Sequence, residues 1–458
     1  MTPFEIDTGT TAWILTSASL VLLMTPGLAL FYGGMVRAKS VLNMMMMSFG
    51  ALALVSVLWV LYGYSMAFGD DIGGGVLGDP LQYLGLKGLM SVDNTVTVVA
   101  DPEQVATYPA MAFVAFQAVF AIITVALISG AIADRAKFST WMVFTGIWAS
   151  LVYFPVAHWV FDFSAGEHVG GWIANNLKAI DFAGGTAVHI NAGVAGLALA
   201  LVLGKRVGWR RDPMRPHNLT LVMIGAGLLW FGWFGFNAGS AVTANAAAST
   251  VWVNTMVATG AAAMAWLVTE KIRDGHPTSL GAASGVVAGL VAITPSCSSV
   301  SPVGAIVVGL VAGVVCALAI GLKYKLGYDD SLDVVGVHLV GGLWGTLSVG
   351  FLATAAAPAG VDGLFYGGGA GQLGRQTVGA LAVLAYSFVL TLVIGLLLHK
   401  TMGFRVSEED EMAGIDNAEH AETGYDLGNL TSSLRGALAG TAPRRADEGH
   451  NHDEEVTA

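Results

Sequence analysis

The chain has 458 residues and a formal net charge of −11, with 55% hydrophobic and only 12% charged residues. Soluble globular proteins carry about twice that share of charge, so this composition excludes an ordinary soluble enzyme and indicates an integral membrane protein. The acidic balance owes much to the C-terminal segment and to the loop 70–103, and it therefore predicts no nucleic-acid partner.

Apolar runs recur along the chain, each close to the roughly 20 residues that a helix needs to cross a bilayer. The first run, from Trp13 to Tyr32, follows Glu5 and Asp7 instead of basic residues, so we expect a retained span and not a cleaved signal peptide. The pattern predicts an all-α integral membrane fold of about eleven spans. They lie near residues 11–34, 41–68, 109–132, 139–161, 186–204, 218–239, 250–269, 278–294, 303–322, 333–354 and 375–399.

Basic residues gather in alternate loops between these spans. One set of loops holds Arg37, Lys39, Arg135, Lys137, Lys205, Arg206, Arg210, Arg211, Arg215, Lys271, Arg273, Lys323, Lys325, Lys400 and Arg405. The opposite loops hold only Lys87, Lys178 and Arg375. Because short loops rich in lysine and arginine stay in the cytoplasm, the sequence predicts an outside N-terminus, a cytoplasmic C-terminus and a multi-pass location in the cell membrane.

Two predicted spans share the pattern HxxxGxxG. Its copies are His189, Gly193 and Gly196 in the fifth span, and His338, Gly342 and Gly345 in the tenth. An aspartate precedes each copy at a different distance, Asp181 in one case and Asp333 in the other. Since the copies lie five spans apart, units of five helices run in opposite directions, which predicts an inverted five-plus-five repeat with its substrate path near the midplane.

A histidine at membrane depth is costly and is a functional candidate by default. We expect His189 and His338 to be partners, because two neutral imidazoles can bond through one nitrogen each and offer the other nitrogens to a small polar solute. Burial disfavours the imidazolium form, so the pair favours conduction of a neutral species or brief passage of a proton. The alternative is that each ring only bonds a backbone carbonyl, and the repeated context argues against it.

Four segments carry a resemblance to a known family. They are FYGG from Phe31 to Gly34, DFAGGTAVHIN from Asp181 to Asn191, GWFGFNAGS ending at Ser240, and DVVGVH from Asp333 to His338. In these motifs and their order, the chain resembles the ammonium transporter family, which includes bacterial ammonium channels, yeast ammonium permeases and Rhesus glycoproteins. The bacterial ammonium channel type is the nearest in character, and the resemblance extends over nearly the whole chain.

The resemblance implies a homotrimer with one pore in each subunit. Carried over by motif, ammonium recruitment falls on Phe120, Ser240 and Phe161, an aromatic gate on Phe120 and Phe236, the pore on His189 and His338, and structural or electrostatic support on Asp181 and Asp333. Phe161 stands where the family usually has a tryptophan, so the ring remains but the indole donor is lost. His158, three residues earlier, is expected to be structural.

The chemistry of these residue types agrees with the implied roles. Phe116 and Phe120 are four residues apart and share one helix face, and an aromatic face attracts a cation by about 0.5–2 kcal/mol. Ammonium can donate a hydrogen bond to the Ser240 hydroxyl, whereas potassium cannot. A closed aromatic pair followed by an apolar lumen makes transfer of a hydrated ion expensive, and only ammonium can shed a proton.

The sequence divides into a transmembrane domain, residues 1–404, and an acidic cytoplasmic tail, residues 405–458. The tail from about Ser432 is expected to be disordered, given its polar and acidic composition. Its earlier part resembles the family's regulatory C-terminus, which implies a PII signalling protein as a partner at the cytoplasmic face.

Two other functions are alternatives to transport. An ammonium sensor would be favoured by a substituted pore histidine or a fused signalling domain, and this sequence has neither. An intramembrane metal enzyme would use His189, His338 and Asp181, but the spacing offers no HExxH motif. With two cysteines and no CxxC pair, the sequence predicts no disulfide framework, no cofactor and no enzymatic activity.

Overall fold

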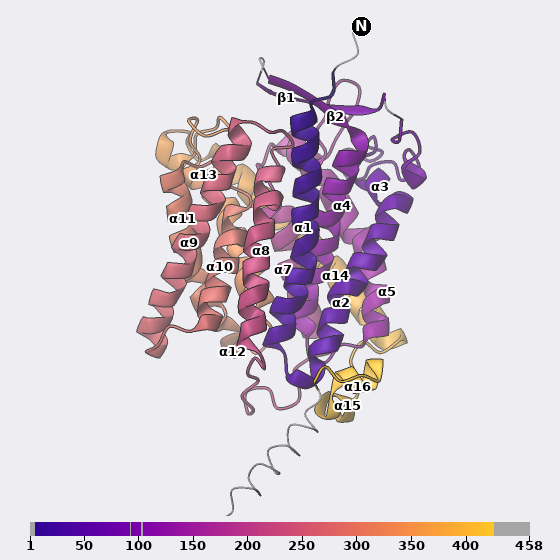
Figure 1. Cartoon of the computed structure of the whole chain (residues 1–458), viewed down its shortest axis with the longest axis vertical. Helices are drawn as coiled ribbons and strands as arrows, with labels where there is room; N and C mark the ends of the chain where they lie inside the picture. Colours follow the sequence, from indigo (N-terminus) through magenta and orange to yellow (C-terminus); the bar gives the residue numbers. More distant parts are fainter. Residues whose placement is uncertain (1–4, 92, 102–103, 426–458) are drawn as a thin grey trace, which may run out of the picture.

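The computed structural model describes residues 5–91, 93–101 and 104–425. Long helices stand side by side and form one bundle (Figure 1), with a β-hairpin at one end and two short C-terminal helices at the other. We call these two ends the hairpin face and the tail face. The charge pattern of the sequence predicts that the hairpin face is outside the cell.

The described elements follow the predicted spans closely. They are α1 (Thr8–Met35), η1 (Ala38–Ser40), α2 (Val41–Leu58), η2 (Trp59–Gly63), α3 (Tyr64–Phe68), η3 (Leu84–Leu86), β1 (Thr95–Asp101), β2 (Gln104–Pro109), α4 (Ala110–Ile128), η4 (Ser129–Ile132), α5 (Phe138–Trp148), η5 (Ala149–Tyr153), α6 (Phe154–Phe161), η6 (Ile173–Leu177), η7 (Gly185–Ile190), α7 (Asn191–Leu203), α8 (Leu219–Gly239), α9 (Ala246–Asp274), α10 (Ser279–Ile293), α11 (Pro302–Ala319), α12 (Leu322–Leu326), η8 (Val335–Leu339), α13 (Val340–Leu352), η9 (Leu364–Tyr366), α14 (Gly371–Thr401), α15 (Glu408–Ala413) and α16 (Ile415–His420).

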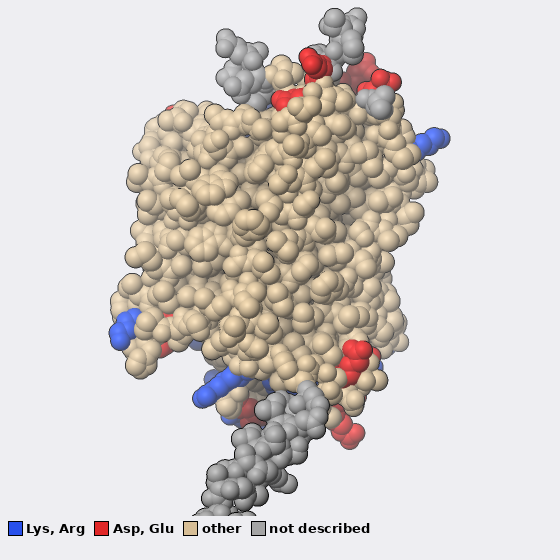
Figure 2. Space-filling view, in the orientation of Figure 1, with Lys and Arg blue, Asp and Glu red and all other residues tan. Residues whose placement is uncertain are grey.

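Within the described residues, ten helical segments are long and apolar enough to cross a membrane. The remaining predicted span corresponds to α10, which is apolar but has only 15 residues. The prediction of an all-α membrane fold is confirmed. On the side shown in Figure 2, the middle of the molecule is free of charged surface, and Lys and Arg gather mainly toward the tail face.

Two features differ from the sequence-based expectation. Helices α9 and α14 extend beyond the predicted spans 250–269 and 375–399 at both ends, because the helical conformation continues past the apolar window. Strands β1 and β2 form an antiparallel hairpin that the sequence analysis did not predict. The hairpin is joined to α1 where the Asp7 amide donates to the Thr107 carbonyl over 2.8 Å.

Helices α7 and α13, which follow the two candidate histidines, run in opposite directions. Arg206, just beyond the end of α7, bonds Asp329, just before η8 and α13, with a shortest side-chain distance of 2.8 Å. The end of one helix therefore lies beside the start of the other. Arg206 also contacts Asp134 at 3.2 Å, so this buried ion network holds three segments together at the tail face.

The glycines of the HxxxGxxG pattern lie where these helices cross. A Cβ added to Gly193 would lie 2.4 Å from the Leu339 nitrogen, and one added to Gly342 would lie 3.1 Å from the Ile190 nitrogen. Each contact joins the glycine four residues after one histidine to the residue directly after the other histidine. The crossing is thus related by an approximate two-fold axis, as an inverted repeat requires.

The start of the C-terminal tail packs against the tail face. Phe404 and Ile415 are fully buried, and α15 and α16 lie beneath α2 and α5 in Figure 1. The carboxylate of Asp416 accepts hydrogen bonds from the Leu42 and Asn43 amides over 3.0 and 2.8 Å. The part of the tail for which the sequence predicts disorder, from about Ser432, lies outside the described residues.

Candidate functional site

His189 and His338 contact each other in the centre of the bundle. Their Nδ1 atoms are 3.2 Å apart, and the rings lie nearly parallel with centroids 5.4 Å apart. A bond between two Nδ1 atoms requires that one ring donates and the other accepts, so the pair can share one proton at this position. His189 is 1% exposed and His338 is 3% exposed, and such burial disfavours a charged imidazolium at either ring.

Both histidines lie in π-helical turns, η7 and η8, which precede the regular helices α7 and α13. π-helical turns leave the ordinary hydrogen-bond ladder and are frequent at functional sites. The two turns therefore place one histidine each at the point where their helices cross.

Asp181 organises the first of these turns. Its carboxylate accepts bonds from four successive backbone amides and from the Thr186 hydroxyl, so the free N–H groups at the start of the turn have a partner. The amides are those of Gly184 at 2.8 Å, Gly185 at 2.6 Å, Thr186 at 2.7 Å and Ala187 at 3.1 Å. Because its oxygens bond the backbone, Asp181 is not the third ligand that a metal site on the two histidines would need.

In the second copy, the residue that matches Asp181 is Asp330, and not the Asp333 that the sequence analysis paired with it. The Asp330 carboxylate accepts from the Val334 and Val335 amides over 3.1 and 2.7 Å. Asp333 instead bonds Lys323 at 2.7 Å. A signal in the sequence could have identified Asp330, because it lies eight residues before His338, as Asp181 lies eight residues before His189.

The backbone conformation also matches Asp330, and not Asp333, to Asp181. Asp333 has a φ of 63° and occupies the position that Gly184 occupies in the first copy, where φ is 125°. Both turns thus need a residue in the left-handed region three positions after the capping aspartate. Asp333 contributes to the turn through its backbone conformation, and its side chain is directed to Lys323.

Aromatic rings cover the histidine pair on one side. His189 stacks on Trp233 with a centroid distance of 5.4 Å and an interplanar angle of 14°, and the indole N–H donates to the Thr294 hydroxyl over 2.8 Å. The His189 Nε2 atom is buried and has no hydrogen-bond partner among the described residues. Nothing in the spacing of the sequence connects Trp233 with His189, and their contact is visible only in the fold.

The residues expected to recruit and gate the substrate also lie close together. Phe120 and Phe236 are stacked at 4.2 Å, and the ring of Phe161 lies 6.3 Å from that of Phe120. Phe116 meets Phe120 edge to face at 4.9 Å. The Ser240 hydroxyl donates to the Phe236 carbonyl over 2.8 Å, which leaves its oxygen free to accept a hydrogen bond.

Two small cavities follow this aromatic group through the bundle. The first, of about 10 Å³, touches Phe236, Trp233 and both histidines and has otherwise apolar walls. The second, of similar size, begins at His338 and reaches Asp333 near the tail face. Each has room for about one water-sized molecule, so the space beside the histidines fits a small solute without its hydration shell.

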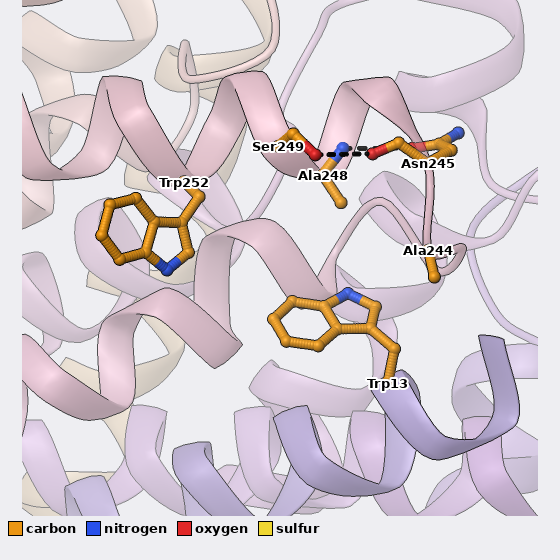
Figure 3. Close-up of a pocket in the computed structure, with 6 residues that line it drawn as sticks. All are labelled: Trp13, Ala244, Asn245, Ala248, Ser249 and Trp252. Carbon is orange, nitrogen blue, oxygen red and sulfur yellow. Dashed lines mark hydrogen bonds between the residues drawn. The ribbon is translucent and has the colours of Figure 1, made fainter. Parts of the chain in front are cut away.

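A wider groove lies elsewhere, near the N-terminal ends of α1 and α9. It measures about 550 Å³ and is bordered by Trp13 and Trp252 (Figure 3). Its lining residues are Trp13, Ala244, Asn245, Ala248, Ser249 and Trp252, none of which is ionisable. The groove includes none of the predicted site residues, and its open shape is unlike that of the cavities beside the histidines.

The fold and the site together define a multi-pass helical membrane protein with a buried histidine pair beside a narrow apolar cavity. Residues 12–425 match the Ammonium Transporter Family. The chain belongs to that family, which makes it a membrane transport protein of the cell membrane and not an enzyme.

Individual relatives agree with this assignment. The chain is 64% identical to an ammonium transporter of Mycobacterium tuberculosis (strain H37Rv) over 442 residues, which cover 93% of this chain and 92% of the relative. It is 47% identical to an ammonium transporter of Aquifex aeolicus, with 92% and 95% covered. Among solved structures, Mep2 of Saccharomyces cerevisiae superimposes with a TM-score of 0.76 at 32% identity, covering 88% of this chain and 91% of that chain. A protein named Sensor Amt Protein superimposes with a TM-score of 0.80 at 28% identity, covering 90% and 98%.

Proposed function

We propose that this protein carries ammonium from the hairpin face to the tail face by recruiting the cation, removing one proton and conducting ammonia past the histidine pair. The observation that carries the proposal is the direct contact of His189 and His338 beside a cavity too narrow for a hydrated ion. A neutral, single-molecule solute fits that space, whereas a hydrated potassium ion does not.

Recruitment is assigned to Phe161, Phe120 and Ser240. The aromatic faces attract a cation, and the free lone pairs of the Ser240 hydroxyl accept a hydrogen bond from ammonium. The stacked rings of Phe120 and Phe236 form the gate, since one of them has to move before a solute can pass. The contacts between these rings support both the recruitment role and the gating role.

Deprotonation breaks one N–H bond of ammonium, and the electron pair stays on the nitrogen. The released proton goes either to water on the hairpin side or along His189 and His338 to the tail face. The Nδ1 to Nδ1 contact and the unpartnered His189 Nε2 support the second route. Solid-supported membrane currents on ammonium addition separate the routes, because only transfer of the proton through the protein generates a current.

The test of the proposal is uptake of ¹⁵N-ammonium, and growth on limiting ammonium, in a strain that lacks its own ammonium transporters. The wild type is expected to restore both. Asp181→Ala is expected to abolish uptake because η7 loses its cap, and His189→Ala combined with His338→Ala to abolish uptake or admit potassium. Wild-type protein present in the membrane without any ammonium uptake would refute the proposal.

We also propose a homotrimer and a PII signalling protein as a partner at the tail face, as the family resemblance implies. The packing of α15 and α16 against the tail face supports a regulatory role for the tail. Native mass spectrometry of the purified protein measures the subunit number, and a pull-down with unmodified PII protein at low effector measures the partner. The sensor alternative has only the likeness to the Sensor Amt Protein fold in its favour.

A further inference from the structure

A second group of ionisable side chains lies at the hairpin face, apart from the histidine pair. We call it the outer cluster and define it as Asp70, Asp71, His158, Asp162 and His168. It joins the loop after α3, the end of α6 and the loop that follows α6. The transport path proposed above uses none of these five residues.

His168 lies between two carboxylates. Its Nδ1 is 2.6 Å from Asp70 Oδ1, and its Nε2 is 2.9 Å from Asp162 Oδ1. Since a carboxylate can only accept, both ring nitrogens must donate, and only the charged imidazolium can do so. The hydrogen bond to Asp162 raises the pKa of His168 to about 9, with a further contribution from Asp70, so the ring is charged at neutral pH.

Of the two carboxylates that bond His168, Asp162 is the buried one and has several other partners. It is the residue directly after α6, it is 5% exposed, and its carboxylate also faces His158 Nδ1 at 3.2 Å. Its carbonyl accepts from the Gly171 amide and from the Asn175 side chain, both over 2.9 Å. The position of Asp162 therefore determines where α6 ends and how the next loop leaves it.

The last residue of α6 is Phe161, one of the residues to which recruitment is assigned. Phe161 contacts the ring of Phe120, which stacks on Phe236, so a continuous series of contacts leads from the outer cluster to the gate. On the other side, Asp70 follows α3, and the neighbouring Asp71 amide donates to the Val169 carbonyl over 3.1 Å. His168 thus ties the loop after α3 to the end of α6.

We propose that His168, clamped between Asp70 and Asp162, is a positioning residue that holds Phe161 beside the gate and thereby sets the apparent affinity for ammonium. This inference rests on the proposed function, because it concerns the same recruitment site. His168 touches no substrate, and its effect passes through Asp162 and the end of α6.

The contacts of the charged His168 ring with Asp70 and Asp162, which we call the clamp, depend on pH. The folded-state pKa of His168 lies above the ordinary value of 6.5, so the clamp is fully present below pH 6.5 and is lost as the pH rises through about 9. The charged groups that face the ring are Asp70 and Asp162, and His158 and Asp71 lie behind Asp162. The pKa of Asp71 is lowered by backbone amides and by His158 despite the opposing effect of its burial, which keeps that carboxylate charged in the same range.

The experiment measures KM and Vmax for ¹⁵N-ammonium uptake by the full chain in a strain without other ammonium transporters, from pH 6.5 to 9.5. His168→Gln removes the charge and one donor from a side chain that is a quarter exposed, so folding is expected to persist. We expect its KM at pH 7, expressed per ammonium ion, to rise about three- to tenfold with Vmax near that of the wild type. Toward pH 9.5 the KM values of His168→Gln and of the wild type should converge.

Glu167→Gln, which changes the exposed neighbouring residue, is the matched control and should keep the wild-type KM.

A second measurement does not depend on transport. Hydrogen–deuterium exchange at the Gly170 and Gly171 amides, which bond Ser164 and Asp162, should be faster in His168→Gln than in the wild type at the same pH. Equal exchange rates would overturn the clamp, and an unchanged KM or a loss of Vmax alone would overturn its effect on affinity. If the wild type takes up no ammonium, the proposed function fails together with the affinity claim, while exchange still decides whether the clamp exists.

Discussion

Asp181 and Asp330 satisfy the free amides at the start of the two helices that carry the histidines. Four N–H groups at the start of any helix lack internal partners, and water is not present at membrane depth to supply them. A carboxylate on the preceding loop solves this problem and places negative charge at the positive end of the helix dipole. The two aspartates therefore hold the starts of the turns that carry His189 and His338.

At this residue scale we predict that Asp330→Asn destabilises the protein and lowers ammonium uptake more than Asp333→Asn does. The asparagine NH₂ group would face the Val334 or Val335 amide, and the lost charge-assisted bonds cost about 1.5–3 kcal/mol each. Among the described residues, the Asp333 side chain, which is 24% exposed, bonds only Lys323, so its change is milder. Thermal unfolding of both variants in detergent, beside ¹⁵N-ammonium uptake, measures the difference. Equal losses in the two variants would contradict the assignment of Asp330 as the counterpart of Asp181.

At the scale of the elements, the crossing of α7 and α13 depends on glycine. The two backbones approach so closely that a Cβ added to Gly193 would clash with the backbone of Leu339. Membrane helices gain little from hydrophobic association, so close packing of small residues is a main source of their attraction. The same close approach brings the two π-helical turns near enough for the imidazoles to touch.

We predict that Gly193→Ala separates these helices and impairs uptake. The added methyl group would lie 2.4 Å from the Leu339 nitrogen, and such overpacking typically costs about 1–3 kcal/mol. Gly374→Ala in α14 is the matched control, because a Cβ there meets no atom of the described residues within 4 Å. That control should unfold at the wild-type temperature or slightly above it, since alanine favours a helix by about 1 kcal/mol over glycine. Wild-type uptake by Gly193→Ala would show that the crossing tolerates a wider spacing.

At the scale of the whole molecule, the tail connects loops that are far apart in sequence. The buried Glu411 carboxylate bonds Arg405 at 2.7 Å and accepts from the Val207 amide over 2.7 Å. Glu419 accepts from the Phe138 amide over 2.9 Å, and Asp416 caps the start of α2. A movement of the tail would therefore reach three loops at the tail face at once.

We predict that Glu411→Gln loosens this docking. The neutral side chain loses the ion pair with Arg405, and the lost charge-assisted bonds weaken the docked state by about 1–3 kcal/mol. Limited trypsin digestion of the purified protein should then cleave after Arg405 at least about fivefold faster, because cleavage follows the population of the open form. The exposed Glu408→Gln is the control and should be cleaved at the wild-type rate. If Glu411→Gln is also cleaved at that rate, the ion pair does not hold the tail.

Much of the fold could be predicted from the sequence, because each span satisfies its backbone hydrogen bonds within itself and its apolar length is a local property. The HxxxGxxG pattern likewise marks the two histidines and the glycines of their crossing. Asp330 was also within reach, through its eight-residue spacing to His338, but Asp333 lay nearer and within the resembling motif.

Several side-chain contacts were decided only by the tertiary structure. Trp233 stacks on a histidine 44 positions earlier in the chain, and His168 bonds Asp70, which is 98 residues away. No periodicity connects such residues, because their contact depends on how several helices pack and on the loops that those helices support. The sequence by itself thus determined the spans and the repeated histidine motif, and it predicted that the two histidines are partners, whereas the stacking of Trp233 on His189 and the outer cluster were decided by packing between distant segments.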